Sequence, residues 1–144
     1  MRKLLAAIAL LVVATASDGH DYVVGQVWTY HVRPGDEGST LQINKIDQNP
    51  TLGTIYHISV FGLRVPNPRV VNGVITELLH LPVSKKTLDL SVDELTNDSP
   101  RVVDYESGYD IWKRAFDSGQ AGIYTISVAD IVAVTEQMMR KSGQ

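Results

Sequence analysis

The spacing of apolar residues changes near Pro82, and this change constrains the fold more than any other feature of the sequence. Before it, apolar and polar residues alternate; Trp28, Tyr30 and Val32, for example, fall on one side of the segment 27–33. After it, apolar residues recur every three or four positions, as in helices. The chain is therefore predicted to be α+β, with an antiparallel sheet of four to five strands from the N-terminal half packed against two to three helices from the C-terminal half. A small half-open barrel decorated by helices is the alternative.

Turn residues divide the first half into strands. The turn 34–38, with Pro34 and two glycines, predicts a hairpin between the first two strands. A second turn is expected at 49–53, and Asn72-Gly73 indicates a bulge or a tight turn in the last strand. The expected strands are 27–33, 39–46, 54–65 and 70–81.

The second half contains helix-start signals. Ser84 and Ser127 are suited to be N-caps, because a serine side chain accepts a hydrogen bond from an amide of the first helical turn. Leu88, Val92 and Leu95 would line one face of the first helix. The elements expected here are a helix from 85 to about 96 that the residues 97–100 end, a helix over 105–118, a short strand over 123–126 and a helix from 128.

The first sixteen residues have the order of an export signal. Arg2 and Lys3 precede the apolar run 4–13, and the small residues 14–16 follow it. The run is too short to span a bilayer core, which needs about 20 apolar residues. We therefore expect residues 1–16 to be a cleaved signal peptide and residues 17–144 to form a single domain that is periplasmic or secreted, without a stable membrane anchor. A buried N-terminal helix is the alternative.

The cleavage position affects one histidine. Cleavage after Ser17 instead of Ala16 would place His20 third in the mature chain. An N-terminal amine, two amides and this imidazole would then form a square-planar nitrogen set for Cu(II) or Ni(II). Cleavage after Ala16 is expected, and it weakens that chelate.

Composition excludes several classes of protein. Sixteen acidic and thirteen basic side chains give a net charge of −3, which removal of Arg2 and Lys3 would bring to −5, so no nucleic-acid partner is expected. The sequence has no cysteine, which excludes disulfides, thiolate metal clusters and cysteine nucleophiles. No cofactor is expected, because the chain lacks a glycine-rich phosphate loop.

Three of the four histidines, His31, His57 and His80, lie on expected strands. On one sheet face they would form a three-imidazole site for zinc or copper. The sequence contains no short HxH or HxxxH spacing, so isolated strand histidines are expected instead, and no metal.

Catalytic motifs are absent from the sequence, which has no GxSxG, SxxK or HExxH. The carboxylates come mostly as neighbours, as in Asp36 and Glu37, which is typical of solvated turns rather than of an acid–base pair. An enzyme is therefore not expected. The alternative is a small hydrolase that uses His31 or His57 as a base, next to a serine or an acid.

Aromatic residues recur at helical spacing along the second helix. This stripe is expected to pack on the sheet, although a ligand platform, for sugars in particular, is an alternative. Trp28 and Tyr30 are likewise expected in the core. The stripe consists of Tyr105, Tyr109, Trp112 and Phe116.

The tip of the first hairpin is the leading binding hypothesis. Arg33, Asp36 and Glu37 offer both charges within a few residues, and His31 and His57 lie on the adjoining strands. These five residues are the candidate contacts for a protein partner of a non-enzymatic exported protein. An immunity or inhibitor protein against a periplasm-delivered toxin is one form of this hypothesis.

The segment from Gly25 to Glu37 has the pattern G-x-V-W-x-Y-x-x-R-P-G-x-E. This run, together with 57–60 and 122–126, resembles a group of small exported bacterial proteins without known activity. The resemblance implies no activity, so it assigns no functional residue.

Overall fold

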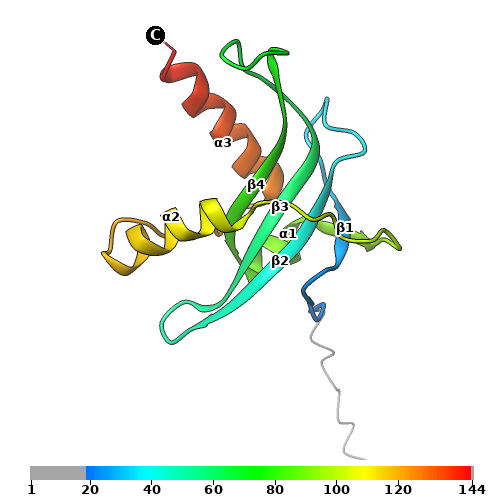
Figure 1. The fold of residues 1–144 in the computed structure, drawn as a ribbon. Coiled ribbons are helices and arrows are strands. Elements are labelled where there is room, and N and C mark those ends of the chain that lie inside the picture. Colours follow the sequence, from blue (N-terminus) through cyan, green and yellow to red (C-terminus); the bar gives the residue numbers. More distant parts are fainter. Residues whose placement is uncertain (1–18, 144) are drawn as a thin grey trace, which may run out of the picture.

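The structure is a computed structural model that describes residues 19–143 (Figure 1). The expected signal peptide and its cleavage site lie outside these residues. The elements are β1 (Val27–Tyr30), β2 (Thr40–Asn49), β3 (Gly53–Pro66), β4 (Val74–Ser84), α1 (Lys85–Ser91), β5 (Val92–Leu95), α2 (Glu106–Asp117) and α3 (Val128–Lys141).

The five strands form one antiparallel sheet in the order β4-β3-β2-β1-β5. The expected α+β architecture is confirmed. The turn between β2 and β3 is where the sequence predicted it: Gly53 has a φ of +77°, and the Asn49 side chain accepts hydrogen bonds from the amides of Thr51 and Leu52. This turn sets the β2–β3 register, which pairs Asn49 with Gly53.

The helices lie on opposite faces of the sheet. Side chains of α1 and α3 join the main core on one face, where Ile58 of β3 is fully buried. The preceding residue of β3, His57, points to the other face and meets Trp112 of α2. In Figure 1, α1 lies behind the sheet and the chain leading into α2 crosses in front of it. The core comprises Tyr22, Trp28, Tyr30, Leu41, Ile43, Tyr56, Ile58, Val60, Leu63, Val65, Leu81, Val83, Leu88, Val128, Ile131 and Val132.

Two helix starts are confirmed. The Ser84 side chain accepts from the Thr87 amide, and the Ser127 side chain accepts from the Asp130 amide. Both serines have extended backbone, as N-caps do.

The expected length of the first helix was wrong, because α1 ends at Ser91 and the chain continues as β5. The Ser91 carbonyl accepts from the His31 amide, and its hydroxyl accepts from the Val128 amide. These bonds direct the chain onto the open edge of β1. Val92 and Leu95 therefore belong to a strand rather than to a helix face.

Two expected strands are also shorter. β1 ends at Tyr30 rather than at Arg33, and the expected strand 123–126 is a single parallel bridge between Tyr124 and Val83. The Tyr124 amide donates to the Pro82 carbonyl, and the Ser84 amide donates to the Tyr124 carbonyl.

Candidate functional site

The sheet face beneath α2 carries a buried polar cluster. His57, in the middle of β3, is fully buried, and β2 and β4 bring Asp47 and His80 to either side of it. The ladder is irregular on both flanks, between Ile43 and Lys45 and between Ile58 and Val60. Such bulges redirect side chains locally, which allows two polar side chains, Asp47 and His80, to meet the His57 imidazole.

Hydrogen bonds connect these residues in one line. Asp47 Oδ2 lies 2.9 Å from His57 Nε2, and His57 Nδ1 lies 3.0 Å from His80 Nε2. The Tyr109 hydroxyl of α2 donates to the same Asp47 oxygen at 2.8 Å. We call Asp47, His57 and His80 the relay.

The hydrogen bonds of the relay determine which ring nitrogen of each histidine carries the proton. An ionised Asp47 only accepts, so His57 carries its proton on Nε2 and uses Nδ1 as an acceptor. His80 must then donate from Nε2, which leaves the lone pair on Nδ1. This Nδ1 makes none of the hydrogen bonds within residues 19–143. Every buried side-chain nitrogen or oxygen of that range has a hydrogen-bond partner, so Nδ1 is not one of the buried atoms. His80 Nδ1 therefore keeps some contact with solvent, although it lies close to Gly108 of α2.

Burial keeps both histidines neutral near pH 7. It lowers the pKa of His57 despite the opposing effect of Asp47, and it lowers the pKa of His80 to about 4, with His57 adding to the shift. Burial alone would raise the pKa of Asp47, but hydrogen bonds from Tyr109 and His57 outweigh it and lower that pKa. Burial and the bond to Asp47 raise the pKa of Tyr109 to about 12. The relay thus carries one negative charge, with Lys45 Nζ 3.7 Å from Asp47 Oδ1 to offset it.

Aromatic rings and one glycine hold the relay in place. The Trp112 ring meets His57 at a centroid distance of 4.9 Å, and Tyr109 meets it at 4.8 Å. A Cβ on Gly108 would lie 2.8 Å from the Cβ of His80. The φ of Gly108 is not positive, so its backbone conformation does not require glycine. Glycine also lowers the stability of a helix by up to about 1 kcal/mol. The close approach of His80 is therefore the reason for glycine at this position.

A cavity of about 390 Å³ opens beside His80. Trp112 forms part of its wall, and the indole N–H donates to the Gly122 carbonyl at 2.8 Å, which ties the loop after α2 to the helix. The wall is mainly apolar. Its residues are His80, Leu81, Pro82, Trp112, Ala121, Gly122, Ile123 and Tyr124.

The hairpin-tip residues are held by contacts inside the protein. Arg33 Nε donates to Asp36 Oδ2 at 2.6 Å, and Arg33 Nη1 donates to Glu136 of α3 at 3.0 Å. Asp36 is buried and also accepts from the Arg64 amide. Of the three charged residues of the tip, only Glu37 is exposed.

The five candidate binding residues do not form one site. His31 has a side chain that is 78% exposed and lies 3.0 Å from Asp93, whereas His57 is buried in the relay. The three strand histidines are not brought together as a metal site, and residues 19–143 contain no group of three His, Cys, Asp or Glu side chains arranged to hold a metal. In the aromatic stripe, Trp112 is buried and Tyr109 is half-buried against the relay.

Sequence reasoning missed Asp47, Gly108 and the partnership of His57 with His80. The first of these was accessible, because a turn at 49–53 in a hairpin places Asp47 near Ile55 and His57. No signal pointed to Gly108, because the sequence alone does not show that α2 crosses His80.

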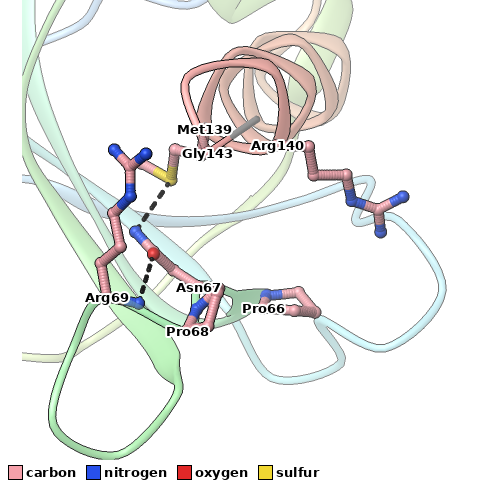
Figure 2. A pocket seen from close by; sticks show the side chains of 7 residues that line it. All are labelled: Pro66, Asn67, Pro68, Arg69, Met139, Arg140 and Gly143. Atoms are coloured by element: carbon pink, nitrogen blue, oxygen red, sulfur yellow. Dashed lines mark hydrogen bonds between the residues drawn. The ribbon is translucent and has the colours of Figure 1, made fainter.

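A second cavity, of about 220 Å³, lies between the loop after β3 and the end of α3 (Figure 2). The guanidinium of Arg69 hydrogen-bonds the Ser142 carbonyl, and the Asn67 amide contacts Met139 Sδ at 3.6 Å. Figure 2 shows the Arg140 side chain pointing away from Arg69. These contacts pack the loop against the end of α3. The cavity is therefore a gap within this packing contact and not the candidate site.

The chain matches no protein-family model, and comparison with curated proteins and with solved structures finds no match. Within residues 19–143, no helix has the length and apolar character needed to cross a membrane.

Proposed function

We propose that this protein binds a small neutral molecule in the cavity beside His80, with the apolar part of the ligand against Trp112 and a hydroxyl or amide N–H donating to His80 Nδ1. The observation that carries the proposal is the solvent-reached Nδ1 of a histidine that lines the cavity and is oriented, through His57, by Asp47. We further propose that the mature chain does so after export, because residues 1–16 have the order of a signal peptide.

The size and lining of the cavity support a small ligand. A volume of about 390 Å³ is near the lower end of typical ligand pockets, which span roughly 300–1,000 Å³. Such pockets are mostly apolar with a few oriented polar groups. Here Pro82, Ile123 and Trp112 supply apolar surface, and His80 supplies the oriented acceptor.

Charge favours a neutral ligand. His57 and His80 are uncharged near neutral pH, and Lys45 offsets Asp47. A cation would therefore find no unbalanced negative charge, and an anion would meet the lone pair of His80. A protein partner at the hairpin tip is supported less, because Arg33 and Asp36 are engaged within the protein.

Titration calorimetry with phenol tests the proposal, and toluene is the matched compound without a donor. Phenol has seven heavy atoms, so a Kd of about 1 mM, or about −4 kcal/mol, needs roughly 0.6 kcal/mol per atom, which is ordinary for a small ligand. We expect phenol to bind at least tenfold more tightly than toluene.

Two variants locate the binding site. His80→Phe keeps a ring and removes the acceptor, so we expect it to abolish the preference for phenol over toluene. His31→Phe is the control, because His31 lies on the exposed side of β1 with Asp93. Equal affinities for phenol and toluene in the unmodified protein, or the same loss in both variants, would contradict the proposal.

A further inference from the structure

We propose that the same cavity hydrolyses small aryl esters, with water as the nucleophile and His80 as the general base. This inference rests on the proposed ligand site. It adds a reaction to that site because the cavity has, besides an acceptor, donors that suit a developing oxyanion.

The base is oriented in the manner that general-base catalysis needs. In the relay, Asp47 fixes the tautomer of His57, and His57 fixes the tautomer of His80, so the lone pair of His80 is on the nitrogen that solvent reaches. Because residue 108 is glycine, α2 passes directly over His80, and this close contact limits the positions of the His80 ring. The imidazole is therefore preorganised before a substrate arrives.

The donors are main-chain amides on the loop after α2. Ala121, Gly122 and Ile123 line the cavity, and their N–H groups make none of the hydrogen bonds within residues 19–143. The loop is held in the middle of this stretch by the bond from Trp112 to the Gly122 carbonyl, and directly after it by the pairing of Tyr124 with β4. Unpaired amides on a held loop are suited to stabilise a carbonyl oxygen that gains negative charge.

The reaction balances without a cofactor. His80 Nδ1 takes a proton from water while the water oxygen bonds to the ester carbonyl carbon, and the carbonyl oxygen becomes an oxyanion near the loop amides. The oxyanion then re-forms the carbonyl, the bond from carbon to the aryl oxygen breaks, and the proton on His80 passes to the phenolate. The products are a carboxylic acid and a phenol.

Aryl esters suit this cavity better than alkyl esters or amides. The aryl group occupies the apolar wall at Trp112, where the proposed phenol ligand binds. A phenolate is also a good leaving group before it is protonated. This matters because His80 is the one imidazole of the described cavity lining, so no second imidazole serves as a general acid.

The pH dependence separates this base from any exposed histidine. The titratable and charged groups around His80 are His57 on β3, Asp47 and Lys45 on β2, and Tyr109 on α2. With a pKa of about 4, His80 is unprotonated over the whole neutral range, so the acid limb of kcat/KM lies near pH 4. Hydrolysis by an ordinary exposed imidazole would instead decline near pH 6.5.

The experiment is hydrolysis of p-nitrophenyl acetate by the full chain, followed from pH 3.5 to 8, with phenol as a competing ligand. We expect saturation, inhibition by phenol and an acid limb near pH 4. His80→Gln is expected to reduce kcat/KM about 100-fold, the lower range for loss of a general base, and His31→Gln to leave it unchanged. Gly108→Ala, which keeps every relay side chain but displaces His80, is expected to reduce kcat about tenfold or more.

The outcomes distinguish the two proposals. Phenol binding without hydrolysis above that of the His80→Gln variant would overturn the esterase inference and leave the ligand site standing. Hydrolysis with a limb near pH 6.5, or hydrolysis that His31→Gln removes, would assign it to exposed imidazoles and overturn the inference as well. Absence of both phenol binding and hydrolysis would overturn both proposals.

Discussion

Replacing Arg33 with alanine removes the centre of the ion-pair network that joins the first hairpin to α3. The Arg33 side chain is 16% exposed and bridges Asp36, whose side chain is fully buried, and Glu136, at 18% exposure. After the substitution, the hydrogen bond from the Arg64 amide is the one that the Asp36 carboxylate keeps within residues 19–143. A buried carboxylate thus loses its cation.

The expected loss of stability follows from this burial. Removing one partner of a fully buried pair costs about 3–5 kcal/mol, because the remaining charge stays desolvated. Arg33 is partly exposed and Asp36 retains one donor, so we expect a loss of about 2–3 kcal/mol. For a domain of this size, that corresponds to a melting temperature lower by about 8–12 °C.

The assay is thermal and urea unfolding of the Arg33→Ala and Glu37→Ala variants. Glu37 is exposed in the same tip and its carboxylate accepts from the Gly35 amide, so its replacement should change stability by less than about 0.5 kcal/mol. If Arg33→Ala unfolds at the same temperature as the unmodified protein, the network does not stabilise the fold. The tip would then regain its place as a recognition surface.

Three further predictions concern stability. Trp28→Ala should destabilise the fold by about 3–5 kcal/mol in urea unfolding, because the ring is buried among Tyr22 and His20; a loss below about 1 kcal/mol would contradict that burial. Ser127→Ala should cost about 1 kcal/mol in the same assay through loss of the cap on α3, and an unchanged midpoint would mean that the cap contributes nothing. His57 and His80 have folded-state pKa values below the ordinary 6.5, so their contribution to folding stability is complete above pH 6.5 and decreases as the pH falls toward about 4. The urea midpoint should therefore fall over this pH window. If the midpoint of the His80→Phe variant depends on pH with the same slope, these histidines are not the cause.

The helix starts could be predicted from the sequence because the chemistry of neighbouring residues is sufficient to define them. A serine before a helical run caps a helix whatever surrounds it, and Ser84 and Ser127 both do so. The segment 92–95 shows the limit of this reasoning. Leu88, Val92 and Leu95 fit a helical stripe, but the open edge of β1 provides backbone partners that a continued helix would not use.

The candidate site was less predictable because it depends on long-range placement. Alternation put His57 and His80 on the outer face of their strands, but the bulges between β3 and β4 decide that their rings meet. The position of α2 over that face, which brings Tyr109 to Asp47, follows from the path of the chain between 96 and 105. Residue spacing does not encode that path.

The central claim, that His80 Nδ1 is the acceptor of a ligand in the cavity, is tested most directly by nitrogen NMR of the histidine side chains during a phenol titration at pH 7. We predict that His80 is protonated at Nε2 and bare at Nδ1, and that phenol shifts His80 Nδ1 together with the Trp112 indole N–H while His31 stays unchanged. A proton on His80 Nδ1 in the free protein, or phenol-induced shifts confined to His31 and His20, would contradict the claim.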